Sequence, residues 1–301
     1  MDVKDSTIRF YFPPIYKIED SIADNPVRQL AQLGYREDVT IETIQIDGIW
    51  GYVLTVLQSG EKILAVLDSN SIPSRYSKVV KISTAIPFPD RADNWLVHPL
   101  SSASTKIGVI NFPDAIQNVL ESWNFSILRN SKDKSIEGLR PPQIGALHAI
   151  LAHWTVSNDA ATVVLPTGTG KTDTMIATLA VRKCERILVV VPSDVLRTQI
   201  ANNFEGLGVL KEKGVLPGDA LFPIVGTLKH KPKNTVDLDE FFEKCQVIVT
   251  TMAIAGTSDA EIQEGMAKWC PYLFIDEAHH IGAKTWGAFK QKFAQNKILQ
   301  F

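Results

Sequence analysis

ATVVLPTGTGKT, residues 161–172, is an apolar run followed by a glycine-rich turn, a lysine and a threonine. The apolar run predicts a buried strand, and the residues from Lys171 onward predict a helix. In such a turn, successive backbone N–H groups and the amino terminus of the helix can point at one ligand, and glycine lets the ligand approach closely. The stretch therefore predicts a polyphosphate-binding loop between a strand and a helix.

Each residue of this loop has an expected part in binding. Lys171 is expected to reach the β- and γ-phosphates, and the Thr172 hydroxyl to serve a magnesium ion. The usual pattern GxxxxGK[ST] begins with glycine, whereas this chain has Leu165 at that position. The alternative is a glycine-rich turn that happens to precede a lysine, and the strand and helix around it argue against that. The expected ligand-binding residues are Pro166, Thr167, Gly168, Thr169, Gly170, Lys171 and Thr172.

A second apolar run, YLFI at 272–275, ends in the carboxylates Asp276 and Glu277. In open parallel sheets, ligands bind outside the carboxyl ends of the strands, where this pair and the loop would meet. Asp276 is expected to bind the metal through its water shell, and Glu277 to orient or deprotonate a water molecule. The alternative is an ordinary acidic pair at a strand end.

The second part of the chain alternates short apolar runs with helical stretches, which predicts a parallel sheet buried on both faces. The polar stretch NSKDKSIEG, 130–138, has the composition of a linker, so we expect a boundary near Lys134 and domains at 1–133 and 134–301. The expected strands are 161–165, 186–191, 223–225, 246–250, 272–276 and 297–301, and the expected helices include 171–184, 193–205 and 283–293.

The first 133 residues predict a smaller, strand-rich α+β accessory domain whose role stays open. Alternating apolar positions at 41–47, 52–57 and 62–67 predict a three-stranded meander with turns at Gly48 and Ser59-Gly60. Apolar residues at helical spacing predict a helix over 113–123. The aromatic run Phe10, Tyr11 and Phe12 is better explained by core packing than by base stacking.

Composition narrows the setting but not the function. The chain has 301 residues, and Lys plus Arg (31) nearly balances Asp plus Glu (33), so any polyanion must be contacted by a local surface. Three separated cysteines argue against a disulfide framework or a thiolate zinc site. No stretch has the apolar length of a signal sequence or a membrane span. We expect a cytoplasmic protein with no membrane partner.

The pair of motifs PTGTGKT (166–172) and DEAH (276–279) resembles the first motor lobe of superfamily 2 helicases and translocases, the DEAD/DEAH-box group. The branch with type I and type III restriction motor subunits is the most similar, and the resemblance covers residues 139–301. It implies a RecA-like P-loop NTPase lobe with ATP and Mg²⁺ as cofactors. It also implies catalytic roles for Lys171, Asp276 and Glu277, metal binding by Thr172 and Asp276, and nucleic acid as the partner.

The resemblance extends to residues with weaker signals. Gln143 matches a glutamine that reads the adenine edge, although a surface glutamine at a helix start is the alternative. His279 matches a residue that couples ATP to the other lobe. The basic run Lys229–Lys233 is either part of a nucleic-acid path or a solvated loop. The implied nucleic-acid contacts are Ser193, Arg197, Gln199, Gly226, Thr227 and Thr251, for which helix capping or ordinary strand-end polarity is the alternative.

The leading hypothesis is a motor lobe that acts on DNA, and the resemblance leaves an RNA helicase lobe open. A rival from another class is an ATP-gated, non-enzymatic binding module, which has no need of Glu277. Residues 297–301, KILQF, resemble the strand that leads into motif III. That motif, the second lobe and its arginine fingers would then lie outside this chain, which would be a fragment, one product of a split gene or an incomplete reading frame. We expect slow turnover by the chain alone, and a second-lobe polypeptide or a defence-system protein as partner.

Overall fold

The computed structural model describes residues 7–46, 49–67, 72, 74–101, 110–127, 138–278 and 283–301. Its contacts divide the chain into two compact units. The first unit comprises Met1–Ile18 and Leu30–Val109, and the second comprises Glu19–Gln29 and Ile110–Phe301. The predicted boundary at Lys134 lies outside the described residues.

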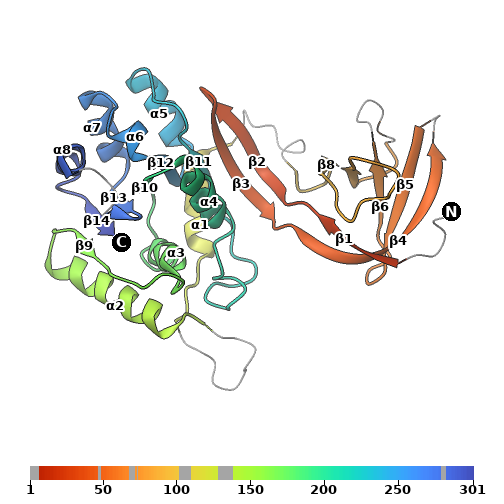
Figure 1. Ribbon diagram of the computed structural model, residues 1–301, viewed down its shortest axis with the longest axis horizontal. Coiled ribbons are helices and arrows are strands. Elements are labelled where there is room, and N and C mark those ends of the chain that lie inside the picture. Colours follow the sequence, from red (N-terminus) through yellow and green to blue (C-terminus); the bar gives the residue numbers. More distant parts are fainter. Residues whose placement is uncertain are drawn as a thin grey trace. The chain divides into compact units, whose positions relative to one another are not determined.

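A six-stranded sheet forms the first unit (Figure 1). Strand β4 pairs with β5 and β5 pairs with β6, both antiparallel, which confirms the predicted meander. The predicted turn at Gly48 lies outside the described residues. Phe10 and Phe12 are fully buried on one face, as the packing interpretation requires. In order across the sheet the strands are β1 (Thr7–Phe12), β4 (Tyr35–Ile46), β5 (Ile49–Val56), β6 (Lys62–Val66), β7 (Val79–Lys81) and β8 (Asn94–Val97).

An eight-stranded sheet is the centre of the second unit. Its last six strands are parallel to one another, which confirms the predicted parallel sheet. Across the sheet they are β2 (Ile15–Ile22), β3 (Asn25–Gln32), β11 (Val225–Thr227), β12 (Val247–Thr251), β10 (Ile187–Val191), β13 (Tyr272–Ile275), β14 (Lys297–Gln300) and β9 (Ala161–Thr162).

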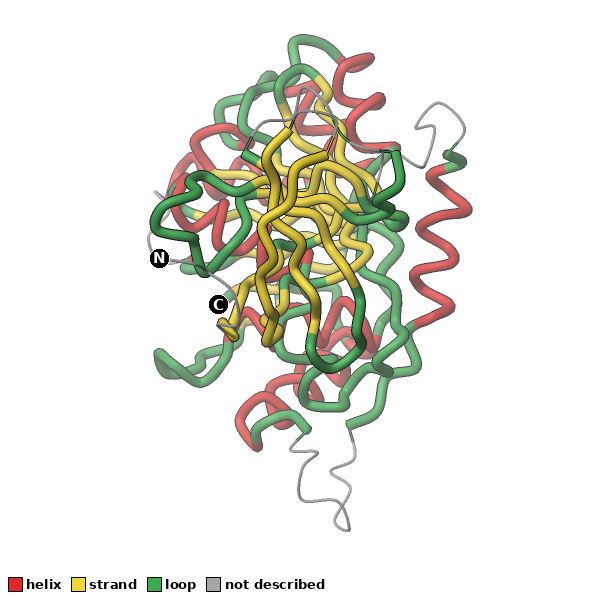
Figure 2. Tube along the Cα trace, turned by 90° about the vertical axis from the view of Figure 1, so that its right-hand side faces the viewer, coloured by secondary structure: helices red, strands yellow, loops and turns green. Residues whose placement is uncertain are grey.

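Helices cover both faces of this parallel sheet, and every helix in the described ranges lies in the second unit (red in Figure 2). Figure 1 shows α5 to α8 on one side of the strands and α2 and α3 on the other. Strands β10 and β12 are wholly buried, and the β10 run ILVVV is continuously apolar, as expected for a strand covered on both faces. The helices are α1 (Phe112–Ser122), α2 (Pro141–Val156), α3 (Lys171–Val181), α4 (Asp194–Glu205), α5 (Thr235–Glu243), α6 (Met252–Ala255), α7 (Ala260–Trp269) and α8 (Ala283–Lys292).

Two strands from early in the sequence complete the sheet of the second unit. The hairpin β2–β3 borders β11, and β3 runs antiparallel to it with Val27 opposite Gly226. Its turn places Ala23 and Asp24 in the left-handed region, with φ of 46° and 64°. Left-handed residues at both positions fit the twist of a two-residue hairpin. The sequence did not predict this hairpin, because a pattern of alternating residues does not identify the strand's partner.

Two further elements differ from the sequence-based expectation. The strand predicted at 161–165 is reduced to β9, which lies at the edge of the sheet, and Val164 beyond it is 90% exposed. The helix predicted at 113–123 is present as α1, but its contacts place it in the second unit. There the Trp123 indole donates a hydrogen bond to the Leu221 carbonyl at 2.9 Å.

Three observations concern the cysteines, the metal-ligating side chains and the possibility of membrane spans. Cys184, Cys245 and Cys270 are free thiols in buried positions, and burial raises the pKa of each above its ordinary value. In the described part of the chain, no group of three or more potential metal-ligating side chains occurs. None of the helices described there is both long enough and apolar enough to cross a bilayer.

Candidate functional site

The loop at 166–170 turns sharply between β9 and α3. Gly168 and Gly170 have φ of 80° and 90°, a left-handed conformation that favours glycine. Gly170 caps the amino terminus of α3. The Thr169 amide and hydroxyl both donate to the Pro166 carbonyl, at 3.2 and 2.6 Å. The loop is therefore held by its own backbone and by the Thr169 hydroxyl, in a shape that only glycine adopts easily at two positions.

Gln143 fastens this loop to α2. Its Nε2 donates to the Gly170 carbonyl at 3.2 Å, and its Oε1 accepts the Arg140 amide at 2.8 Å. Any Cβ at Gly170 would collide with Gln143 Nε2. The side chain is 3% exposed, so both ends of the amide are used inside the protein. These contacts favour a structural role for Gln143, and its predicted contact with adenine stays a prediction.

Lys171 and Glu277 form an ion pair at one edge of the sheet. Lys171 Nζ lies 3.0 Å from Glu277 Oε1, and the two side chains are 22% and 28% exposed. Glu277 has φ of 54°, an uncommon conformation for a non-glycine residue and a form of strain typical of functional sites. The sheet brings them together because β13 and β9 are parallel strands that end at the same edge.

Asp276 lies directly before Glu277 and is 6% exposed. Its backbone amide donates to the Val190 carbonyl at 3.0 Å, whereas its buried Oδ1 has no hydrogen-bond partner among the described residues. Burial raises the pKa of Asp276, the Glu277 charge raises it further, and the Lys171 ammonium opposes both. An unpartnered, desolvated carboxylate oxygen at this position is available to a cation or to a bound water.

These groups surround one cavity of about 650 Å³. It brings together most of the predicted loop with the acidic pair, and it adds Gln199, which was predicted for another role. Sequence reasoning missed Arg140, Asp173, Asn203 and Val209. The predicted residues on its wall are Thr167, Gly168, Gly170, Lys171, Thr172, Gln199, Asp276 and Glu277.

Two of the missed residues connect the loop to its surroundings. Arg140 Nη1 donates to the Gly168 carbonyl at 3.0 Å, and Asp173 Oδ1 accepts the Val209 amide at 3.4 Å. Burial raises the pKa of Asp173, while the bond from Val209 and the charge of Arg140 lower it. The signal available in the sequence was that Arg140 lies close to Gln143 and that Asp173 directly follows Thr172. Their residue types alone did not indicate that they belong to the site.

The predicted nucleic-acid residues on α4 occupy three different environments. Ser193 is exposed and caps the helix by accepting the Leu196 amide at 3.3 Å. Arg197 is 7% exposed, and its Nη1 lies 2.8 Å from Asp194 Oδ1. Gln199 is exposed at the cavity. The helix-cap alternative for Ser193 is therefore observed, and the contacts with nucleic acid stay predictions.

The remaining predicted contacts lie at the ends of β11 and β12. Gly226 and Thr227 are buried in β11, and a Cβ at Gly226 would collide with Cys245 Sγ. Thr251 is 2% exposed and precedes α6. All three lie near the sheet edge that carries the cavity, but with little side-chain surface. His279 lies outside the described residues.

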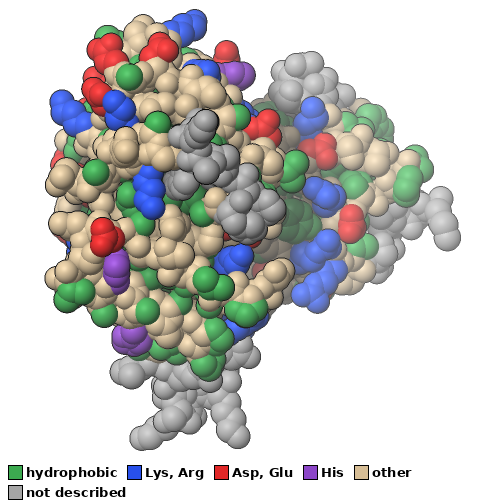
Figure 3. Space-filling model, turned by 60° about the vertical axis from the view of Figure 1, so that its left-hand side comes forward, with side chains coloured by type: hydrophobic (Ala, Val, Ile, Leu, Met, Phe, Trp, Pro, Cys, Tyr) green, Lys and Arg blue, Asp and Glu red, His purple; other side chains and the backbone are tan. Residues whose placement is uncertain are grey.

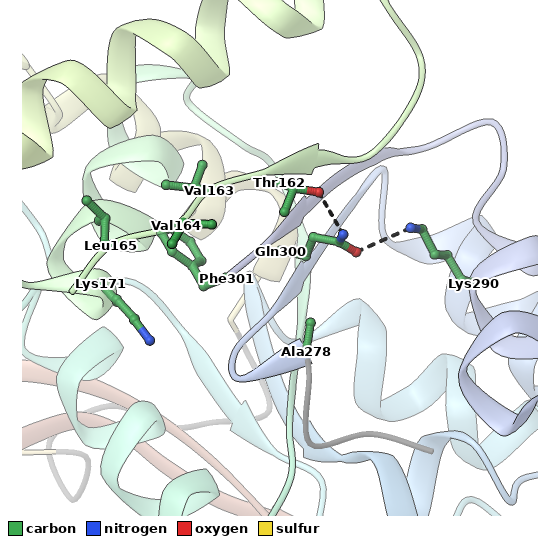
Figure 4. Close-up of a pocket in the computed structure, with 9 residues that line it drawn as sticks. All are labelled: Thr162, Val163, Val164, Leu165, Lys171, Ala278, Lys290, Gln300 and Phe301. Atoms are coloured by element: carbon green, nitrogen blue, oxygen red, sulfur yellow. Dashed lines mark hydrogen bonds between the residues drawn. The ribbon is translucent and has the colours of Figure 1, made fainter. Parts of the chain in front are cut away.

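A second cavity of about 460 Å³ lies on another side of Lys171 (Figure 4). Leu165, the residue that departs from the glycine of the usual pattern, lines it together with Phe301 and Ala278. Gln300 bridges its polar end by donating to Thr162 Oγ1 at 2.7 Å and accepting from Lys290 Nζ at 3.2 Å. The apolar side chain at position 165 thus lines this second cavity, while the loop that follows it faces the larger one.

Comparisons with known proteins identify a family for the part of the chain that carries this cavity. The family described as type III restriction enzyme, res subunit, matches residues 136–301, more than half of the 301-residue chain. The UvsW helicase from bacteriophage T4 is similar at 15% identity and a TM-score of 0.38, covering 63% of this chain and 58% of that one. A hypothetical ATP-dependent RNA helicase from Sulfolobus tokodaii is similar at 16% identity and a TM-score of 0.37, covering 64% and 50%.

The chain therefore spans less than two thirds of either solved structure, and at these TM-scores the two add nothing to the family match. No curated protein sequence matches it. The family match covers both motifs, the parallel sheet and the cavity between them. This chain belongs to the family of type III restriction enzyme res subunits, and its second unit is a helicase-family ATP-binding lobe.

Proposed function

We propose that the second unit is the ATP-binding motor lobe of a DNA helicase or translocase, which drives movement on nucleic acid once a second lobe completes it. The observation that carries this proposal is the meeting of Lys171 and Glu277 at 3.0 Å beside the buried Asp276. The family is named for a restriction enzyme, whose substrate is DNA, and this supports DNA over RNA.

The phosphate loop binds the triphosphate of ATP. The amides at the start of α3 and the Lys171 ammonium neutralise its charge, and the left-handed glycines allow close approach. Lys171 is paired with Glu277 in this structure, so phosphate oxygens compete with that carboxylate for the ammonium. ATP binding therefore exchanges one partner of Lys171 for another.

The residues fit a magnesium ion. Asp276 Oδ1 is a buried oxygen without a partner among the described residues, and Thr172 contributes a hydroxyl to the same cavity. Magnesium characteristically takes one or two protein oxygens and completes its shell with water and phosphate, so a larger cluster of side chains is not required. When bound, the ion supplies neutralisation of the phosphate charge.

Glu277 is the group that orients or deprotonates the attacking water. Once the ammonium of Lys171 is drawn to phosphate, the Glu277 carboxylate can accept a hydrogen bond or a proton from water. A module that only binds ATP has no use for such a group, which supports hydrolysis over gating. Arginine fingers from a second lobe contribute about 10³ to 10⁵ in rate in related reactions, so we expect slow turnover by this chain alone.

Calorimetry with Mg·ATP tests the proposal. The wild-type chain is expected to bind, and Lys171→Ala to bind at least tenfold more weakly. Lys183→Ala is a matched control, because Lys183 is exposed before the opposite, amino-terminal end of β10. Equal binding by wild type and Lys171→Ala, or no binding by either, overturns the proposal. DNA and RNA are then compared for stimulation of hydrolysis in a protein that also carries the second lobe.

A further inference from the structure

The basic run Lys229-His230-Lys231-Pro232-Lys233, called the basic loop below, follows β11 directly. Because β11 is parallel to β12, the basic loop leaves the sheet at the same carboxyl-terminal edge as the phosphate loop and Asp276. The Leu228 amide donates to the Val249 carbonyl at 2.9 Å, which fixes where the loop begins. The basic loop therefore lies on the edge that carries the site.

The hairpin β2–β3 holds the basic loop in shape. Asn25 begins β3, and because β3 runs antiparallel to β11, this residue meets the end of β11. The Lys229 and His230 amides both donate to Asn25 Oδ1, at 2.6 and 2.9 Å, and Asn25 is only 3% exposed. The other end of the loop is fixed where the Lys233 amide donates to Asp237 Oδ2 at 3.2 Å.

The charges of the basic loop face solvent. Lys229, His230, Lys231 and Lys233 are all exposed. None of the ion pairs found between described residues engages these lysines, and Lys231 Nζ donates only to the Thr257 carbonyl, at 2.8 Å. On the face shown in Figure 3, blue Lys and Arg side chains lie singly or in small groups rather than as one positive field. Because Lys plus Arg (31) nearly balances Asp plus Glu (33) over the whole chain, a polyanion must be held by local clusters such as this one.

We propose that the basic loop binds the phosphate backbone of the nucleic acid, and that Asn25 is the residue that positions it. This inference rests on the proposed function and names a contact surface for it. Exposed lysines on a backbone that is fixed at both ends provide sequence-independent contacts with phosphates. The early hairpin thus takes part in gripping the substrate, because its Asn25 sets the course of the loop.

The first test neutralises the loop in the 301-residue protein with Lys229→Gln and Lys233→Gln together. Binding of a labelled single-stranded DNA of about 16 nucleotides is followed by fluorescence anisotropy between about 50 and 200 mM salt. Losing two phosphate contacts should weaken binding about tenfold near 0.1 M salt and flatten the log–log salt slope by about 1.4. The matched control, Lys183→Gln with Lys268→Gln, removes the same charge before the opposite ends of β10 and β13 and should change neither quantity.

A second test separates positioning by Asn25 from general stability. Asn25→Ala should speed hydrogen exchange at the Lys229 and His230 amides and weaken DNA binding about threefold, with Mg·ATP binding unchanged. Asn25→Asp keeps an acceptor oxygen at the same place and should restore protection of both amides. Unchanged DNA affinity in Asn25→Ala, despite faster exchange at those amides, overturns the role of Asn25.

The outcomes also distinguish this inference from the proposed function. If wild-type protein binds Mg·ATP but no DNA or RNA at any salt, the motor function itself fails. If wild type binds DNA and the Lys229→Gln, Lys233→Gln protein binds equally well with the same salt slope, only the role of the basic loop fails. An equal loss in the control variant shows a general charge effect and overturns the inference as well.

Discussion

Replacing Glu277 with glutamine should tighten ATP binding and slow hydrolysis at the same time. At 3.0 Å, the attraction between Lys171 and Glu277 is about 5–6 kcal/mol for an effective dielectric constant near 20. Both side chains are about a quarter exposed, so solvent screening reduces the net value to the range measured for exposed pairs, about 0.2–1 kcal/mol. Removing the competing carboxylate should therefore increase ATP affinity by about 1.4- to fivefold.

The assay pairs calorimetry of Mg·ATP binding with single-turnover hydrolysis, because the chain alone is expected to turn over slowly. Glu185→Gln is the control: it removes the same charge from an exposed residue before the opposite end of β10. Glu277→Gln should bind more tightly and hydrolyse more slowly than both wild type and control. Weaker binding, or hydrolysis at the wild-type rate, would refute the idea that Glu277 holds Lys171 until phosphate arrives and then handles water.

Four other substitutions give separate outcomes. Asp276→Asn should raise the melting temperature near neutral pH, because it removes a desolvated charge. Since the pKa of Asp276 is raised in the folded state, the wild-type carboxylate becomes protonated as pH falls through that pKa, and thermal melts should show the gain fading over that range. Gly170→Ala should cost about 1–3 kcal/mol in urea unfolding and abolish ATP binding, since a Cβ there meets Gln143. Gln143→Ala should weaken ATP and GTP equally in competition binding; a selective loss of ATP would restore its predicted role at adenine. Ser193→Ala should lower the free energy of unfolding by about 1 kcal/mol through loss of the α4 cap.

The sequence predicted the parts of the site that depend on local pattern. The loop from Pro166 to Thr172 needs glycine at two left-handed positions and a helix directly after it, and both are visible as residue types and periodicity. Asp276 and Glu277 follow a continuously apolar run, so the end of a buried strand could be predicted and with it the edge where the pair would lie. The parallel sheet follows from the same alternation of runs.

The parts that were missed depend on contacts between distant segments. Nothing in residues 15–32 indicates that they pair with β11, because β-pairing is set by packing and not by the strand's own pattern. The sequence does not indicate the burial of Arg197 beside Asp194 either, since an arginine on a helix is usually exposed. Gln143 was singled out by its spacing, whereas its contacts with Gly170 and Arg140 required the fold.

The hairpin β2–β3 also governs how this protein can be divided. A cut at Lys134 would yield a lobe whose sheet stops at β11, with the unpaired N–H and C=O groups of that strand open to water. Unprotected edges of this kind recruit strands from other molecules, so such a fragment would self-associate whatever the quality of its nucleotide site. A fragment of the second unit that is meant to fold alone must therefore include the early hairpin, although the hairpin lies before the predicted boundary in the sequence.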